Sequence, residues 1–197
     1  MNEVGPLEVG RPSLVIVCGV PGSGKSTFAR HVADRSGAVW FASETFAEEL
    51  GAAARTPAGD LSKEAIAHAY AAMGAAVKDA LATNKLVIAV GSFRSEEHRR
   101  CFRNVARRSG AGVVTLRSVC PIETAARRVR LRRAFGERGP GEEAIHQIDA
   151  ELNRASDIDI VLINESSLED FQRVIDDFIR VELGSEYHAS PADIPGG

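Results

Sequence analysis

The chain has 197 residues, of which 44% are hydrophobic and 26% are charged, and its formal net charge is -3. This length suits one domain, and the small negative charge argues against a generally basic nucleic-acid-binding protein. No apolar run approaches the roughly 18 residues that a membrane-spanning helix needs. The polar start of the chain carries no signal-peptide pattern, so we expect a cytoplasmic protein.

Two residue types that often form metal or disulfide sites are scattered along the chain. The three cysteines, Cys18, Cys101 and Cys120, lack the spacing of a metal site, which favours reduced thiols. The five histidines do not cluster either. We therefore expect the histidines to lie at the surface.

The first predicted element is an apolar strand at 14–18, and it runs into a glycine-rich segment. Gly19–Thr27 fits the pattern G-x-x-x-x-G-K-[ST]. The glycines let consecutive backbone N–H groups curl around a phosphate. Lys25 is expected to reach the β- and γ-phosphates of ATP, and the Ser26 hydroxyl to ligate Mg²⁺. The predicted nucleotide site comprises Gly19, Pro21, Gly22, Ser23, Gly24, Lys25, Ser26 and Thr27.

Short apolar strands and longer helical segments then alternate along the chain. Helices are predicted at 26–35, 45–50, 61–82, 95–108, 121–133, 142–154 and 168–183, and further strands at 38–41, 86–90, 113–116 and 158–163. Alternation of this kind implies right-handed β-α-β crossovers. We predict an α/β fold of the three-layer phosphate-loop NTPase type, with a five-stranded parallel sheet and helices on both faces. Its domain spans 13–183, between a flexible lead-in at 1–12 and a disordered tail at 184–197.

Ligands collect at the carboxyl ends of parallel strands, so the residues that follow each strand are candidates for the site. Glu44 follows the second strand, where it could act as a general base or orient an acceptor hydroxyl, or could instead favour the start of a helix. Many phosphate-loop proteins hold magnesium with an aspartate after the third strand. Here Gly91 and Ser92 follow it, and Ser92 could supply an oxygen or cap a helix.

Arginines follow the third and fourth strands. Arg128 and Arg132 are four residues apart and share a helix face. With Arg138 in a small lid at about 134–141, they could stabilise a transferring phosphoryl group, or they could belong to a solvated basic face. Arg94 and Arg99 lie nearest a strand end and could grip an anionic acceptor.

With these residues the chain resembles the small phosphate-loop kinases grouped near gluconate kinase, adenylylsulfate kinase, zeta toxin and bacterial polynucleotide kinase. The resemblance covers 14–179. Phe41–Glu44 is similar to the family's Ser-Asp at the end of strand two, with glutamate substituted. The resemblance implies that Arg128 and Arg132 form a lid pair, that an arginine recurs at the place of Arg99, and that the loop near Asn164 lies beside the nucleotide base.

Three functions remain open from the sequence. The leading hypothesis is an ATP-dependent kinase that transfers the γ-phosphate of Mg-ATP to a hydroxyl of a small molecule, nucleoside or nucleotide. The alternatives are a nucleotide-binding ATPase or regulatory module with little kinase turnover, and a 5′-hydroxyl polynucleotide kinase. The arginine-rich helix lacks interleaved aromatic residues, so a nucleic-acid groove has little support. We expect no membrane partner.

Overall fold

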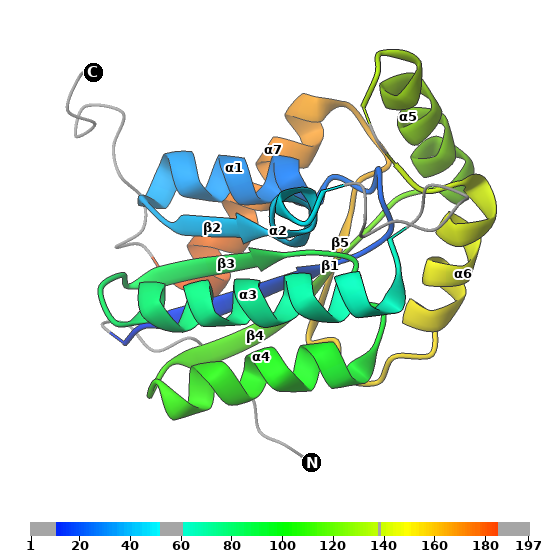
Figure 1. Cartoon of the computed structure of the whole chain (residues 1–197). Helices are drawn as coiled ribbons and strands as arrows, with labels where there is room; N and C mark the ends of the chain where they lie inside the picture. Colours follow the sequence, from blue (N-terminus) through cyan, green and yellow to red (C-terminus); the bar gives the residue numbers. More distant parts are fainter. Residues whose placement is uncertain (1–10, 52–60, 138, 185–197) are drawn as a thin grey trace.

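The computed structural model describes residues 11–51, 61–137 and 139–184 (Figure 1). Most of the predicted lead-in and tail, and Arg138 of the predicted lid, lie outside the described residues. The elements are β1 (Ser13–Cys18), α1 (Lys25–Ser36), β2 (Val39–Ala42), α2 (Ser43–Glu49), α3 (Lys63–Leu81), β3 (Leu86–Val90), α4 (Glu96–Arg108), β4 (Gly112–Val119), α5 (Ile122–Ala134), α6 (Glu142–Leu152), β5 (Ile160–Ile163), α7 (Leu168–Phe178) and the π-helix η2 (Ile179–Leu183).

The five strands form one parallel sheet in the order β2-β3-β1-β4-β5. β1 occupies the centre, where Val15 lies opposite Ile88 of β3 and Val114 of β4. This arrangement confirms the predicted fold class. Because all strands run the same way, the residues that follow β1, β2 and β3 meet at one edge of the sheet.

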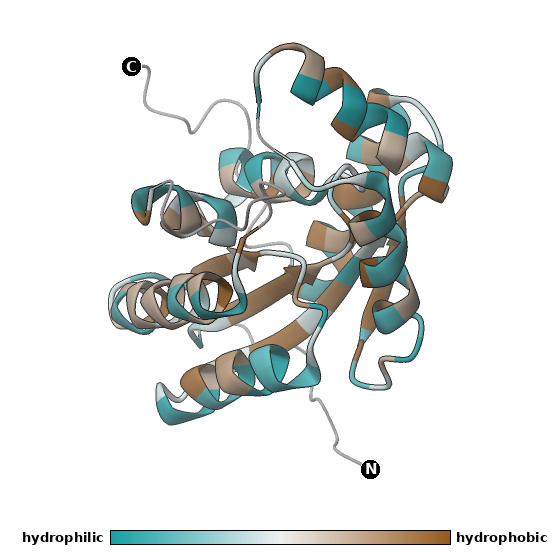
Figure 2. Ribbon diagram, turned by 45° about the vertical axis from the view of Figure 1, so that its right-hand side comes forward, coloured by the Kyte–Doolittle hydropathy of each residue, from teal (hydrophilic) through white to brown (hydrophobic). Residues whose placement is uncertain are grey.

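Helices cover both faces of the sheet, and the sequence of β1 shows why. All six residues of β1 are buried, and successive side chains point to opposite faces. Leu14 and Ile16 pack in the cluster that holds residues of α3 and α4, whereas Val15 and Val17 pack with residues of α1 and α7. In Figure 2 the strands are accordingly apolar, and the helices are polar over much of their outer surface.

Element boundaries differ from the predictions at a few places. The second helix begins at Ser43 rather than at 45, and β4 continues to Val119 because that end of the strand pairs with β5. β5 begins at Ile160, two residues later than predicted. The last helix changes from α to π geometry after Phe178. Ser62 caps α3, because its side chain accepts a hydrogen bond from the backbone N–H of Ala65. No helix among the described residues is long and apolar enough to cross a membrane.

Candidate active site

The segment between β1 and α1 takes a conformation that requires glycine. Gly22 and Gly24 have φ values of 89° and 105°. A Cβ on Gly22 would lie 2.6 Å from the carbonyl oxygen of Ala125, and one on Gly24 would lie 2.3 Å from Nδ2 of Asn164. Both distances are shorter than any normal contact, so the loop can pack here only without these side chains.

Side chains from distant parts of the chain hold the loop in place. The carbonyl oxygen of Ser23 accepts hydrogen bonds from Nδ2 of Asn164 and Oγ of Ser118, each at 2.8 Å. The carbonyl oxygen of Gly22 accepts a bond of 3.0 Å from Nη1 of Arg128. Asn164, predicted to lie near a nucleotide base, therefore also supports the phosphate-binding loop.

Lys25 lies inside the loop with its charge only partly compensated. The side chain is 5% exposed, and its Nζ donates to the carbonyl oxygen of Val20 at 2.8 Å. Burial lowers the pKa of Lys25, and the positive charge of Arg132 adds to this effect, while the negative charge of Glu44 opposes it. An anionic phosphate would restore the balance of charge around the ammonium group.

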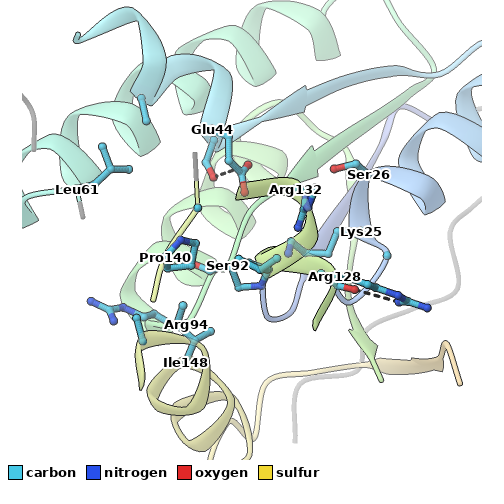
Figure 3. A pocket seen from close by; sticks show the side chains of 18 of the residues that line it. Lys25, Ser26, Glu44, Leu61, Ser92, Arg94, Arg128, Arg132, Pro140 and Ile148 are labelled. Atoms are coloured by element: carbon cyan, nitrogen blue, oxygen red, sulfur yellow. Dashed lines mark hydrogen bonds between the residues drawn. The ribbon is translucent and has the colours of Figure 1, made fainter. Parts of the chain in front are cut away.

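A cavity of about 870 Å³ opens at the carboxyl ends of the strands and joins most of the predicted site residues (Figure 3). Figure 3 shows Lys25, Ser26 and Arg128 on one side of the cavity, with Arg132 drawn between Lys25 and Glu44. The predicted site residues that line it are Pro21, Gly22, Gly24, Lys25, Ser26, Thr27, Glu44, Ser92, Arg94, Arg128, Arg132 and Asn164. The fold thus brings the candidate nucleotide, base and arginine positions to one space.

Two members of the loop are placed behind this surface rather than on it. Gly19 and Ser23 do not line the cavity, and Ser23 is fully buried. Gly19 lies so close to β4 that a Cβ there would be 2.4 Å from the carbonyl oxygen of Ser118. Gly19 and Ser23 therefore contribute to the packing of the loop and not to the surface of the cavity.

Arg99 has a different place from the one predicted, and the expectation that it grips an acceptor is wrong. Its side chain is 2% exposed and does not line the cavity. Nε donates to both carboxylate oxygens of Asp157 at 2.9 Å, and Nη2 donates to Oδ1 at 2.6 Å. Nη1 donates to the carbonyl oxygens of Phe93 and Arg94 at 2.6 and 3.1 Å. Arg99 therefore ties the loop after β3 to the segment before β5.

The sequence-based prediction missed several cavity residues on α2, α3 and α4. The Tyr70 hydroxyl accepts a 2.9 Å hydrogen bond from the backbone N–H of Phe93, which has an unusual φ of 44°. The Tyr70 ring stacks on His98 at a centroid distance of 4.2 Å, and both residues line the cavity with Glu48. The expectation of a surface position is therefore wrong for His98. It is also wrong for His31, which is partly buried and hydrogen-bonded to Asp176.

Some arginines of α5 lie on a solvated face and others line the cavity, which are the two alternatives that the sequence left open. Arg130 pairs with Glu142 at 2.8 Å on the surface, as a solvated face would. Arg128 and Arg132, in contrast, line the cavity. The two readings of the cluster therefore apply to different members of α5.

The residues present fit Mg-ATP, with a metal site that depends on few protein ligands. Ser26 is exposed in the first turn of α1 and offers its hydroxyl, and Glu44 is a carboxylate in the same cavity. Gly91 follows β3, and a Cβ there would lie 2.7 Å from the Tyr70 hydroxyl, so a side chain at this position would have to displace that group. Within the described ranges, no three His, Cys, Asp or Glu residues could together hold a metal ion. Mg²⁺ commonly keeps several waters and binds through substrate phosphates, so this sparse donor set suffices.

The parallel sheet and its glycine loop define a phosphate-loop NTPase domain of the type found in small kinases. The family model for the AAA domain matches residues 14–155, and the chain belongs to that family. No protein of curated function matches the sequence.

Three solved structures illustrate the likeness of the fold. A gluconokinase from Sinorhizobium meliloti 1021 has a TM-score of 0.63 at 18% identity, over 87% of this chain and 94% of its own. The Mycobacterium tuberculosis APS kinase CysC in complex with AMPPNP and APS has a TM-score of 0.60 at 22% identity, over 84% and 96%. Chaetomium thermophilum Kti12 in complex with ADP-AlF3 has a TM-score of 0.60 at 19% identity, over 87% and 100%.

Proposed function

We propose that the protein is an ATP-dependent phosphotransferase that moves the γ-phosphoryl group of ATP to a hydroxyl of a small molecule. The observation that carries the proposal is that Lys25 and Glu44 face the same cavity from the ends of β1 and β2. β3 lies between these strands, so their ends are about 10 Å apart at the usual strand spacing. The loop after β1 and the helix after β2 both border the cavity, and we place the phosphoryl group and the acceptor hydroxyl between them.

Each residue has a definite part in this proposal. Lys25 and the loop N–H groups hold the phosphates of ATP, and Ser26 with waters holds the Mg²⁺, which neutralises phosphate charge when bound. The acceptor oxygen forms a bond to the γ-phosphorus while the bond to the bridging oxygen breaks, so that ADP leaves with that electron pair. Glu44 accepts the proton of the hydroxyl. Arg128 and Arg132 offset the charge on the group in transit, and Arg138 is proposed to join them from the lid.

A hydrogen bond from a neighbouring side chain orients the Glu44 carboxylate. Oγ of Ser43 donates to Oε2 of Glu44 at 3.2 Å. The side chain remains exposed in the cavity, where an acceptor can reach it. We propose that Ser92 lies next to the acceptor at the end of β3, since it also lines the cavity.

The test is a kinase assay with purified protein, Mg-ATP and a panel of sugar acids, polyols, amino alcohols, nucleosides and 5′-hydroxyl oligonucleotides. Glu44→Gln should slow transfer by about 10²–10⁴-fold, the usual contribution of a general base, while ATP binding is retained. Glu49→Gln is the matched control, because Glu49 is exposed on α2 and does not line the cavity. Intact ATP binding without phosphorylated product from any acceptor would refute the proposal.

One observation favours a second candidate, a nucleotide-binding module with little turnover. Gly91 stands where many phosphate-loop enzymes have a magnesium-binding aspartate, and a side chain there would have to displace the Tyr70 hydroxyl and Oγ of Ser43. Single-turnover measurements separate the candidates. A module would bind ATP and neither hydrolyse nor transfer it, whereas the phosphotransferase forms ADP faster when an acceptor is added.

A further inference from the structure

The half of the cavity that lies away from the phosphate-binding loop is mainly apolar. Figure 3 shows Leu61, Pro140 and Ile148 on the side opposite Lys25 and Ser26. The apolar residues from α2, α3, α6 and the adjoining loops that line the cavity include Ala47, Leu61, Ile66, Ala69, Pro140 and Ile148. The same cavity also presents polar groups, including those of Ser92, His98 and Gln147, so a ligand here would meet apolar walls with a few polar groups among them. The walls therefore suit an acceptor with an apolar body.

Two carboxylates face this half of the cavity from one helix. Glu44 and Glu48 are four residues apart on α2 and both line the cavity. The helical rise places them about 6 Å apart along the axis. In the part of the chain that the structure describes, no hydrogen bond or ion pair involves the Glu48 carboxylate, so it is available to a ligand.

The positive groups near these carboxylates are already engaged or belong to the other half. Nε of Arg94 lies 3.5 Å from Oε2 of Glu151, which offsets its charge. Arg99 points to Asp157, away from the cavity. Burial lowers the pKa of His98, and the charges of Arg94 and Arg99 add to the effect against that of Glu97, so the charged form of the imidazole is disfavoured. This half of the cavity thus disfavours an anionic acceptor.

We propose that the acceptor is an amphipathic amino alcohol, with an apolar body, a hydroxyl at Glu44 and a protonated amine about 6 Å away at Glu48. This inference rests on the proposed phosphotransferase function. The hydroxyl oxygen takes the γ-phosphoryl group, ADP leaves, and the proton passes to Glu44. The amine keeps its proton and does not react. Glu48 is therefore a specificity residue, and Glu44 is the residue that contacts the reacting atoms.

The test compares three acceptors that share one ring and one hydroxyl: aminocyclohexylmethanol, its methyl counterpart and its carboxylate counterpart. Wild-type kcat/KM should fall in that order, with the amine favoured over the methyl compound by about fivefold, as expected for one charge pair at a partly exposed site. Glu48→Gln should reduce this ratio to near one. Glu49→Gln, the adjacent exposed control outside the cavity, should leave the ratio and the basal activity unchanged.

The outcomes separate this inference from the function on which it rests. Equal or faster transfer to the carboxylate compound, or to a polyol such as sorbitol, would overturn the amino alcohol assignment and leave the phosphotransferase function in place. An undiminished ratio in Glu48→Gln would do the same. Product from none of the acceptors, with ATP bound, would overturn both.

Discussion

The Asp157→Asn variant tests the ion pair between Asp157 and the buried Arg99, which joins two segments behind the cavity. Asp157→Asn removes the charge that faces Arg99, whose side chain is only 2% exposed, while the Asp157 side chain is 26% exposed. Removal of one partner from a buried ion pair costs about 3–5 kcal/mol. Because water reaches the Asp157 side of the pair, we expect the lower end of that range, about 3 kcal/mol of the free energy of unfolding.

The effect should depend on pH in a defined direction. Partial burial alone would raise the pKa of Asp157, but the hydrogen bonds and positive charge of Arg99 outweigh it and lower the pKa. A carboxyl whose pKa is lower in the folded state stabilises the protein above its unfolded pKa of about 3.9, and that contribution is lost as the pH falls through the lower folded value. The difference in the free energy of unfolding between wild type and Asp157→Asn should therefore have its full value at pH 7 and should decrease only at acid pH.

Urea unfolding followed by circular dichroism between pH 7 and pH 3 measures this difference. The matched control is Glu151→Gln, because the Arg94–Glu151 pair is longer, at 3.5 Å, and both side chains are about one third exposed. That variant should lose less than about 1 kcal/mol. A loss below about 1 kcal/mol for Asp157→Asn at pH 7 would refute the reasoning, and so would a difference that does not change down to pH 3.

Three further predictions concern the loop and its surroundings. Gly22→Ala should weaken ATP binding by tenfold or more in calorimetry, because its Cβ would meet Ala125. The control is Gly37→Ala, which is also at positive φ but has open space around the Cβ. It should leave ATP binding unchanged and lower the free energy of unfolding by about 1–2 kcal/mol. Lys25→Met should raise the urea midpoint, since burial already disfavours the charged lysine, and should lower ATP affinity; a lower midpoint would contradict this. Tyr70→Phe leaves the buried N–H of Phe93 without its acceptor and should lower the free energy of unfolding by about 1–3 kcal/mol, an effect that an unchanged midpoint would exclude.

The features that the sequence predicted well are those encoded over short distances. Strand β3 has the predicted bounds, because an apolar run flanked by polar residues identifies a strand covered on both faces. Gly19–Thr27 specifies its own loop, since glycine spacing and the following helix lie in one segment. The position of Glu44 in the cavity then follows from the rule that ligands bind at the carboxyl ends of strands, whereas Arg132 was proposed because it shares a helix face with Arg128.

The features that were missed depend on contacts between distant segments. Arg99 and Asp157 are 58 residues apart. The position of Arg99 near a strand end was visible in the sequence, but its partner in a distant segment was not. Tyr70 was not singled out in the sequence; it packs in the core, and its hydroxyl reaches the loop after β3 only through the packing of α3 against β3. His98 is a single histidine whose position next to Tyr70 depends on how α3 and α4 pack together.

The two halves of the cavity are built from different structural elements, which decides which residues can be substituted independently. The glycine loop lies between β1 and α1 and is held by side chains of β4 and α5, and those contacts leave little freedom for change. The opposite wall comes from other elements, chiefly α2, α3 and α6. Substitutions at positions such as Glu48 or Ile66 therefore leave the contacts that hold the glycine loop in place. If the proposed function holds, a library over the cavity-lining positions of α2 and α6 that keeps Glu44 would change the acceptor wall without changing the glycine loop.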